Sequence, residues 1–391
     1  MSSTHRASPL GSLSVETFLR DYWQKKPLLI RQAFPDFENP LSADELAGLS
    51  LEDEVESRVV LEHGERPWEL RRGPFFEEDF RTLPEQDWTL LVQAVDQFVP
   101  DVAELMNAFR FLPSWRLDDV MISYATPGGS VGPHFDNYDV FLLQGQGHRR
   151  WKIGQHCDAE SPLLDNPDLK ILSDFDQQEE WLLAPGDMLY IPPGLAHYGI
   201  AEDECMTYSI GFRAPSQHEV LVHYTDFLGQ HLNDQQRYSD ADQSVVADPA
   251  AIDDTAVERL RDILLAAADD KTALAIWFGR FMTEPRYPEL IQPIEGVAGE
   301  LEEVLNQGYG LVRNLSARLA YRVEGEQLVL FASGEHCVLP ASLLPLVQLI
   351  CNEDYLDSEH LLQWQADPEG WTLLQQLLDK GDLLLEGDDD E

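Results

Sequence analysis

The sequence predicts an α+β protein in which an antiparallel barrel or jelly roll is followed by a helical block and a winged-helix-like C-terminal module. Three observations predict this order. Residues 118–212 contain short runs rich in Val, Ile, Tyr and Phe, separated by Gly and Pro turns, which is typical of antiparallel β architectures. Apolar residues then recur at helical spacing from residue 220 onward. Residues 285–391 mix helical patterns with a hairpin signal.

The composition indicates a folded and strongly acidic protein. Of the 391 residues, 27 are Lys or Arg and 71 are Asp or Glu, so the formal net charge is −44. A hydrophobic content of 43% argues against disorder. No block of the chain is dense in Lys and Arg, as a surface that replaces counterions on nucleic acid must be. We therefore expect basic partners and no direct binding to nucleic acid.

No segment of the sequence has the pattern of a signal peptide or a membrane span. Residues 1–15 lack an apolar stretch, and apolar runs such as residues 343–350 are too short to cross a bilayer. The four cysteines form no C-x-x-C pair, so a disulfide framework and a structural zinc site are both poorly supported. We expect a cytoplasmic protein with no membrane attachment.

The first domain is expected to span residues 1–213. Apolar residues recur at helical spacing over residues 14–24, and Pro27 ends that helix before the strand-like residues 28–30. The strands of the barrel are expected at residues 120–124, 139–143, 150–153, 188–191 and 206–211.

A helical block is expected over residues 214–284. Its first helix has an apolar stripe formed by Val220, Leu221, Tyr224, Phe227 and Leu228. Two further helical patterns follow, at residues 256–268 and 272–282. Such a stripe must be buried against something, so we interpret the block as a dimerisation element and expect a homodimer.

The winged-helix-like module is expected over residues 285–391. Its hairpin is expected from residues 323–331, through a turn at Ser333 and Gly334, to Val338. Because the surroundings are acidic, a packing or protein-contact role is favoured over DNA binding. Its helices are expected around Leu301, Leu315, Leu346, Leu361 and Leu374.

The residues most informative about chemistry are His134, Asp136 and His197. On a strand, residues i and i+2 point to the same side, so His134 and Asp136 are expected to project together into the barrel. His197, on a later strand, can face them. Two imidazoles and one carboxylate on one face make the facial triad that holds Fe(II) and leaves positions open for a co-substrate and oxygen. The pattern predicts an oxygenase metal site in which no side-chain acid or base is needed.

The alternative for any H-x-D pair is a set of ordinary buried histidines. The flanking turns favour the metal site. Pro, Gly and Ser at residues 127–130 let the backbone turn sharply before His134, and turns at residues 185–187 and 192–194 bracket the strand that leads to His197.

With these motifs the sequence closely resembles the JmjC and cupin family of Fe(II)- and 2-oxoglutarate-dependent oxygenases. Within it, the match is to bacterial ribosomal oxygenases that hydroxylate an arginine of large-subunit ribosomal protein sixteen. The resemblance runs from the W-Q-K-K-P-L-L-I segment at residues 23–30 through the triad, and the domain layout extends it over nearly the whole chain. It implies a double-stranded β-helix as the catalytic domain, Fe(II), 2-oxoglutarate and O2 as cofactor and co-substrates, and a basic ribosomal protein as substrate.

The far carboxylate of 2-oxoglutarate needs a cation at the barrel wall, and Arg149, Arg150 and Lys152 are the candidates after the triad. If Trp151 faces the core, alternation puts Arg149 inside with it and sends Arg150 and Lys152 to the other face. We expect Arg149, whose planar fork can hold a carboxylate with two hydrogen bonds. The alternative is a surface arginine.

The resemblance also assigns further residues around this pocket. It places the co-substrate arginine at Arg149 and a supporting polar residue at Ser123, so that Arg149, Ser123, His134 and Asp136 are the expected co-substrate contacts. Alternation puts Asp119, Met121 and Ser123 on one strand face. For Asp119, a turn or cap role beside Asp118 is equally open. The positions that match the family's arginine-recognition residues are Asp119, Met121, Tyr138 and Ser209.

Three functional classes remain open. The first is an arginine hydroxylase of a large-subunit ribosomal protein, for which the resemblance favours C3. The second is a JmjC oxygenase that acts on another protein residue, such as histidine. The third is a non-catalytic metal-binding cupin. The sequence does not determine the target arginine, the stereochemistry, the biological purpose or the role of the C-terminal module.

Overall fold

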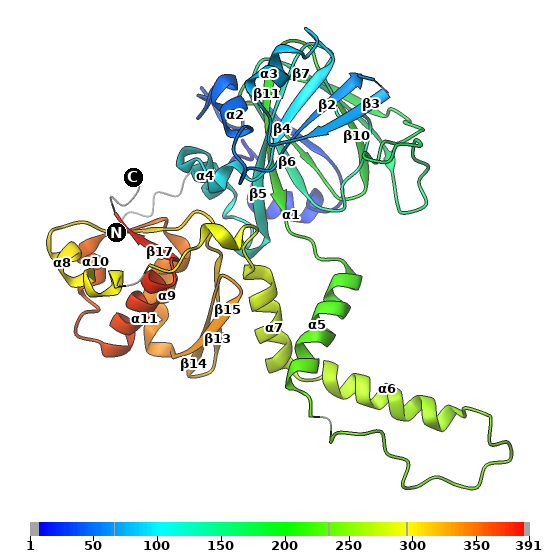
Figure 1. Cartoon of the computed structure of the whole chain (residues 1–391), viewed down its shortest axis with the longest axis vertical. Coiled ribbons are helices and arrows are strands. Elements are labelled where there is room, and N and C mark those ends of the chain that lie inside the picture. Colours follow the sequence, from blue (N-terminus) through cyan, green and yellow to red (C-terminus); the bar gives the residue numbers. More distant parts are fainter. Residues whose placement is uncertain (1–7, 66, 234, 295, 387–391) are drawn as a thin grey trace. The chain divides into compact units, whose positions relative to one another are not determined.

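Two antiparallel sheets form a jelly roll in the first part of the chain (Figure 1). The structure is a computed structural model that describes residues 8–65, 67–233, 235–294 and 296–386. Its two compact units are Met1–Ala214 and Pro215–Glu391. Residues 1–7, part of the opening stretch expected to lack a signal peptide, lie outside the described ranges.

The larger sheet has eight strands in the order β1-β9-β6-β11-β5-β4-β2-β3, and the smaller has three in the order β10-β7-β8. The strands of the larger sheet are β1 (Leu28–Ile30), β2 (Ser57–His63), β3 (Pro67–Arg72), β4 (Trp88–Val92), β5 (Leu117–Ala125), β6 (Val140–Gln146), β9 (Met188–Ile191) and β11 (Cys205–Phe212). The strands of the smaller sheet are β7 (Arg149–His156), β8 (Glu179–Leu183) and β10 (Leu195–Ala201).

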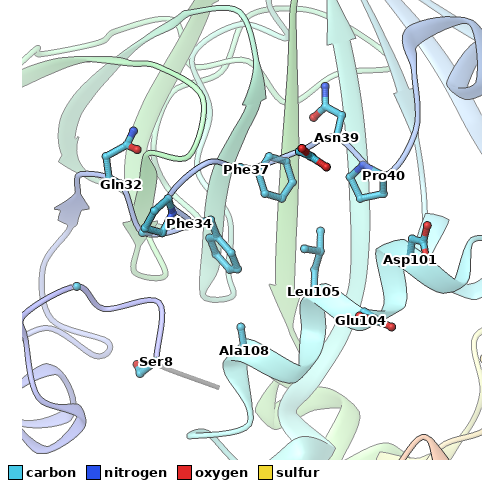
Figure 2. Close-up of a pocket in the computed structure, with 14 residues that line it drawn as sticks. Ser8, Gln32, Phe34, Phe37, Asn39, Pro40, Asp101, Glu104, Leu105 and Ala108 are labelled. Carbon is cyan, nitrogen blue, oxygen red and sulfur yellow. The ribbon is translucent and has the colours of Figure 1, made fainter. Parts of the chain in front are cut away.

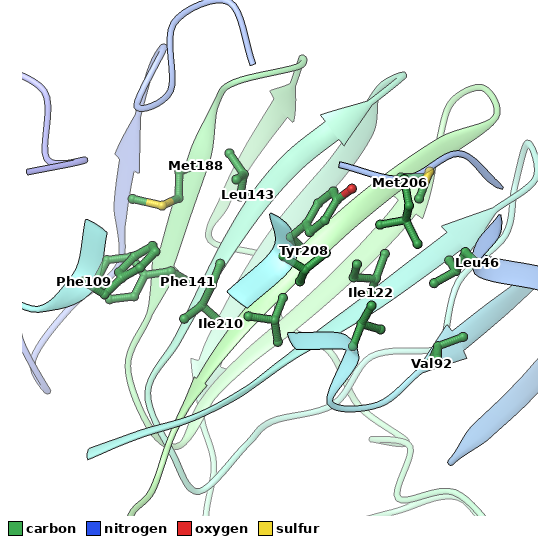
Figure 3. Packing of buried hydrophobic residues seen from close by; sticks show 14 of the residues in the cluster. Leu46, Val92, Phe109, Ile122, Phe141, Leu143, Met188, Met206, Tyr208 and Ile210 are labelled. Atoms are coloured by element: carbon green, nitrogen blue, oxygen red, sulfur yellow. The ribbon is translucent and has the colours of Figure 1, made fainter. Parts of the chain in front are cut away.

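Alternation gives the larger sheet two different faces. Ile122 of β5 and Tyr208 of β11 are directly paired and fully buried in the main core, on the face covered by the N-terminal helices (Figure 3). Their neighbours Ser123 and Ser209 must therefore point the other way, toward the smaller sheet. That direction is confirmed by the hydrogen bond between Ser123 and Arg149 of β7.

The N-terminal helices form where the sequence supplies caps and one apolar face. Helix α1 (Val15–Asp21) begins after Ser14, whose side chain accepts a hydrogen bond from the Thr17 amide, and it buries Phe18 completely. Helix α2 (Ala43–Leu49) begins with a capping box between Ser42 and Glu45. The remaining helices of this unit are α3 (Glu77–Arg81), α4 (Pro100–Met106), η1 (Val95–Gln97), η2 (Asn107–Phe109) and η3 (Ser114–Arg116).

The two sheets face each other across a smaller apolar cluster. Trp151 and Ile153 of β7 pack there with Leu195 of β10, against residues of the larger sheet such as Leu142 and Leu189. All five side chains are nearly inaccessible to solvent. This apolar cluster excludes water from part of the space between the sheets, where β7 and β10 also carry polar side chains.

The second unit begins with three helices, α5 (Gln217–His231), α6 (Asp254–Ala268) and α7 (Lys271–Thr283). Helices α5 and α7 pack together through Tyr224 and Trp277, whose ring centroids are 5.3 Å apart. Helix α7 also packs on the following sheet, because the Cα of Gly279 lies directly against the Phe331 ring. A Cβ at position 279 would be 2.3 Å from that ring, so the close approach requires glycine.

In its described residues, the rest of this unit holds two three-stranded sheets and four short helices with a common apolar core. The sheets are β13-β14-β15 and β16-β12-β17. The strands are β12 (Leu311–Arg313), β13 (Leu319–Glu324), β14 (Gln327–Ala332), β15 (Glu335–Pro340), β16 (Tyr355–Leu356) and β17 (Leu383–Leu385). The helices are α8 (Leu301–Asn306), α9 (Leu344–Asn352), α10 (Ser358–Leu362) and α11 (Pro368–Asp379), with 3-10 turns η4 (Pro288–Leu290), η5 (Val297–Gly299) and η6 (Ala341–Leu343).

One expectation for this unit was wrong, and another was incomplete. No helix forms around Leu315, because residues 311–313 pair with β16 and β17 as strand β12, and the Asn314 side chain then caps a turn by accepting the Ser316 amide. The expected turn at Ser333 and Gly334 is confirmed, because β14 and β15 pair across it. The expected first strand, residues 323–331, is instead broken by a turn at Gly325, with φ +63°, so that a third strand, β13, extends the hairpin to a meander. Within the described residues, no helix is long and apolar enough to span a membrane.

Candidate active site

His134, Asp136 and His197 come together between the two sheets. Each offers one ligand atom, and these atoms all lie within 4.8 Å of one another. The Nε2 of His197 is 3.6 Å from Oδ2 of Asp136, and the two imidazole centroids are 4.2 Å apart. The 3.6 Å separation is too long for a hydrogen bond, and three donor atoms this close match the spacing of ligands around one metal ion.

The backbone around His134 differs from the expected strand. His134 makes only an isolated bridge with His197, in which each amide donates to the other's carbonyl, and Asp136 lies in irregular backbone before β6. The reason is local, since Gly132 has φ +83° and Pro133 follows it, which interrupts a regular ladder. The Asp136 carbonyl accepts the Gly194 amide, so this segment is held against the turn that precedes β10.

Both imidazoles are oriented by backbone carbonyls. The Nδ1 of His134 is 2.9 Å from the Gly132 oxygen, and the Nδ1 of His197 is 3.0 Å from the Leu195 oxygen. Because a carbonyl oxygen can only accept, each Nδ1 carries the proton and each Nε2 keeps its lone pair. This is the arrangement that fixes histidine ligands in metal sites. The residues present therefore fit a ferrous ion.

Burial keeps His197 neutral. Its side chain is almost fully enclosed, and desolvation, followed by the nearby His134, lowers the pKa of His197 to about 4. At neutral pH the ring is uncharged, which is the form that binds a metal ion.

Arg149 lies between the same two sheets, on β7 beside the strand that carries His197. Its Nη1 donates to Ser123 Oγ at 3.3 Å, and the side chain is 5% exposed. Its Nε and Nη2 are buried without a hydrogen-bond partner among the described residues. A buried guanidinium with unused donors is costly unless an anion reaches it. The neighbouring Arg150 instead points outward, where it pairs with Glu180 and Glu202.

The expected arginine-recognition residues lie on one face of β5 and β11 or next to it. Met121 is directly opposite Ser209 in the β5 and β11 pairing. Asp119 is 5% exposed and accepts a hydrogen bond from Gln93 Nε2 at 2.6 Å. Tyr138 is 43% exposed, and desolvation of its hydroxyl, followed by the charges of Asp136 and Asp119, raises its pKa. The Tyr138 hydroxyl is therefore close enough to both carboxylates for their negative charges to oppose its ionisation.

Two residues at this face were missed by sequence reasoning. Gln93 contacts Asp119, and Arg58 of β2 places Nη2 3.4 Å from the Met121 sulfur. No local motif marks either residue. Their positions follow only from the pairing of β2 with β4 and of β4 with β5, which joins segments far apart in the chain.

A separate cavity of about 730 Å³ lies on the opposite face of the larger sheet (Figure 2). Phe34, Phe37 and Leu105 are among its lining residues. The Phe37 ring contacts Tyr208, with centroids 5.6 Å apart, and Tyr208 points away from the Ser209 face. The sheet thus separates this cavity from the triad, and the cavity is not the candidate active site.

Models of two known domain families match the chain, one in each half. A JmjC domain model matches residues 104–220, which contain the triad, Arg149 and Ser123. A ROXA-like winged helix model matches residues 266–383.

One curated relative matches almost end to end. The chain is 37% identical over 384 residues to the "Ribosomal protein uL16 3-hydroxylase" of Escherichia coli K12, which covers 96% of this chain and 99% of the relative. The chain belongs to the JmjC ribosomal oxygenase family. The resemblance noted from the sequence, and with it the α+β fold of a jelly roll followed by a winged helix, is confirmed.

Solved ribosomal oxygenase structures agree with this assignment. The "X-Ray structure of E. coli ycfD" has a TM-score of 0.87 to this chain at 37% identity, covering 96% of this chain and 99% of that one. A second structure of the same E. coli ribosomal oxygenase is described as a complex with cobalt and 2-oxoglutarate, and it has a TM-score of 0.84 at 36% identity with the same coverage. A more distant relative, "Bifunctional lysine-specific demethylase and histidyl-hydroxylase NO66" of Aedes aegypti, is 27% identical over 47% of this ribosomal oxygenase chain and 30% of the relative.

Proposed function

We propose that the chain hydroxylates an arginine side chain, at C3, of a basic large-subunit ribosomal protein of the uL16 type, using Fe(II), 2-oxoglutarate and O2. The observation that carries this proposal is the convergence of His134, Asp136 and His197 within 4.8 Å beside a buried arginine with unused donors. The E. coli relative named for this reaction, which aligns over nearly the whole chain, supports the choice of substrate.

His134, Asp136 and His197 would hold the metal ion as a facial triad. When bound, iron with 2-oxoglutarate and O2 supplies the oxidising power that converts an unactivated C–H bond to C–OH. The chain itself orients the ligands. The Gly132 and Leu195 carbonyls fix both rings through Nδ1, and Trp151, whose ring centroid is 5.9 Å from that of His197, keeps one side of the site dry.

Arg149 and Ser123 would bind the far carboxylate of 2-oxoglutarate. Arg149 and His197 lie on the neighbouring strands β7 and β10, and Trp151 contacts both side chains. A carboxylate placed there would accept from Arg149 Nε and Nη2, the two atoms that lack partners among the described residues. The co-substrate would therefore enter between the sheets with its 2-oxo end toward the triad.

The substrate arginine would lie on the Asp119 side of the site. Asp119 is buried and acceptor-only when ionised, so it can pair with a guanidinium, while Met121, Tyr138 and Ser209 would hold the alkyl chain and the backbone. The chain's formal charge of −44 would attract a basic ribosomal protein over roughly a Debye length of 10 Å.

Hydroxylation of a histidine is the second candidate, because relatives that include the histidyl-hydroxylase share part of this chain. A neutral imidazole gains less from the buried carboxylate of Asp119 than a guanidinium does. Asp119 therefore favours the arginine substrate.

We also propose that the chain forms a homodimer through its helical block and acts in the cytoplasm, where ribosomal proteins are made. Helix α6 carries apolar side chains that stay more than two-fifths exposed: Val257, Leu260, Ile263, Leu264 and Leu265. A second copy would bury this stripe. Because a twofold interface is self-complementary, one apolar helix face is sufficient to form it.

The test of the enzymatic proposal is a reaction with purified components. The chain is incubated with Fe(II), 2-oxoglutarate, O2 and ribosomal protein uL16, and intact and fragment masses are measured. We expect a gain of one oxygen on one arginine, together with succinate, and neither product with the His134→Ala variant. Oxygen gained on a histidine would establish the second candidate. Absence of O2-dependent succinate would leave a metal-binding protein without catalysis.

A further inference from the structure

A network of buried hydrogen bonds centres on Asp139, which follows Asp136 by three positions. The Asp139 side chain has no solvent exposure. Its Oδ1 accepts the Tyr190 hydroxyl at 2.7 Å, and its Oδ2 accepts Gln24 Nε2 at 2.9 Å and Arg116 Nη2 at 3.2 Å. Three donors thus converge on one carboxylate.

The donors come from three segments that are distant in sequence. Gln24 follows α1, Arg116 ends η3, and Tyr190 belongs to β9. The Tyr190 hydroxyl also accepts the Gln24 amide at 2.7 Å, and the Trp23 ring stacks on Tyr190 with centroids 5.7 Å apart. Trp23 therefore packs on Tyr190, and Gln24 bonds to both Tyr190 and Asp139. The proposed catalytic roles do not involve either residue.

The position of Asp139 in the chain gives this network a consequence. The segment from His134 to Asp139 has no regular secondary structure apart from the bridge at His134. At its start it exchanges amide bonds with His197, and at its end the Asp139 carbonyl accepts the Phe212 amide. Asp136 and Tyr138 lie between these two points. The Asp136 carbonyl also accepts the Gly194 amide, so the Asp139 end and this bond together determine how the two side chains are placed.

We propose that Asp139 is a positioning residue, which fixes the end of the 134–139 segment and so holds Asp136 and Tyr138 in place. Gln24, Arg116 and Tyr190 support it. A carboxylate suits this place because it accepts at every lone pair, whereas an asparagine would turn an N–H toward one of the converging donors. The proposal rests on the proposed function only in taking Asp136 as a metal ligand.

The test measures cobalt(II) binding to the metal-free full chain by calorimetry, without substrate or turnover. We expect Asp139→Asn to weaken cobalt affinity by about 10–100-fold, the range for loss of a group that orients metal ligands. In assays with substrate we expect more succinate per hydroxylated arginine, because a displaced Tyr138 no longer holds the target. The unfolding midpoint of each variant is first measured by circular dichroism, and cobalt binding is then measured at a temperature well below it.

Asp187→Asn is the matched control. Asp187 is also a buried carboxylate of this unit, and it accepts bonds from the Gln32 amide, the Ala184 amide and Arg31 Nη1, but it lies in the turn before β9, outside the 134–139 segment. We expect its cobalt affinity to stay within about twofold of the parent chain, a difference well below 1.4 kcal/mol.

Each outcome has a separate meaning. A parent chain that binds no cobalt contradicts the proposed metal site itself. A folded Asp139→Asn variant with parental cobalt affinity overturns the positioning role, as does an equal loss in Asp187→Asn. If Asp139→Asn does not fold, Tyr190→Phe removes one donor and leaves the carboxylate. For it we expect a loss of about 10-fold, the lower end of the range for such groups, and parental affinity would overturn the proposal.

Discussion

Arg149 and Ser123 meet across the two sheets of the jelly roll, with Nη1 of the arginine 3.3 Å from the serine hydroxyl. This bond uses one of the arginine's three nitrogens, and the other two are buried without partners in the part of the chain that the structure describes. A protein that holds a guanidinium this way has a preformed place for a carboxylate, since desolvation is already complete before the anion arrives.

Replacing Arg149 by methionine should therefore raise the KM for 2-oxoglutarate by about 10–100-fold, because two charged hydrogen bonds of about 1.5–3 kcal/mol each are partly replaced by contacts with water. The measurement is succinate formation at varied 2-oxoglutarate. The matched control is Arg150→Met, which removes the neighbouring but outward-facing guanidinium and should leave KM unchanged. An equal rise in both variants would contradict the role of Arg149.

Replacing His197 by alanine should abolish cobalt binding in the micromolar range, with a loss of at least about 100-fold, since one of three ligands is removed. The measurement is calorimetric titration of the metal-free chain. His148→Ala, which removes a half-exposed histidine that pairs with Asp203 outside the triad, is the control and should bind as the parent does. Parental affinity of the His197 variant would show that the metal is held elsewhere.

Replacing Asp119 by asparagine should raise the KM for the ribosomal protein by about 10–100-fold, because the proposed buried partner of the substrate guanidinium loses its charge. Turnover of 2-oxoglutarate without substrate should persist, since the triad and Arg149 are intact. Asp118→Asn is the control, because Asp118 pairs with Arg213 and lies on the other face of β5. Unchanged KM in the Asp119 variant would favour a substrate other than arginine.

Replacing Leu264 by glutamate should convert the chain from dimer to monomer, because a charge placed in the apolar stripe of α6 must be desolvated in the interface. Leu264 is 67% exposed within the chain, so the monomer itself should remain folded. The measurement is sedimentation over a range of concentrations. Val245→Glu, at a fully exposed position outside any helix, is the control; a parent chain that is already monomeric would refute the dimer.

Replacing Gly279 by alanine should destabilise the second unit by about 1–3 kcal/mol, because the new methyl group overlaps the Phe331 ring. Gly229→Ala is the control, since nothing lies within 4 Å of a Cβ there, and it should stabilise α5 by about 0.5–1 kcal/mol through helix propensity. Thermal unfolding followed by circular dichroism distinguishes them. Equal midpoints for the two variants would contradict the packing of α7 on β14.

Much of the site was predictable because its chemistry depends on residue type and short-range order. The H-x-D pair and His197 between Pro and Gly turns indicate a metal site, although the strand expected at Asp136 is irregular backbone. Alternation along β7 separates Arg149 from Arg150, because the side-chain period of a strand is fixed by covalent geometry. The helix expected around Leu315 failed, since a short apolar stretch fits a strand or a helix equally well until its partners are known.

The sequence by itself determined the residue types of the proposed metal ligands, the order of β and α regions and the acidic net charge. Only the tertiary structure decided which residues, distant in sequence, contact the side chains in and around the site. Gln93 reaches Asp119, Arg58 reaches Met121, and Gln24 reaches Asp139 across 115 positions of chain. Such contacts are set by strand order and by the packing of α1 on the sheet, and no local pattern encodes either.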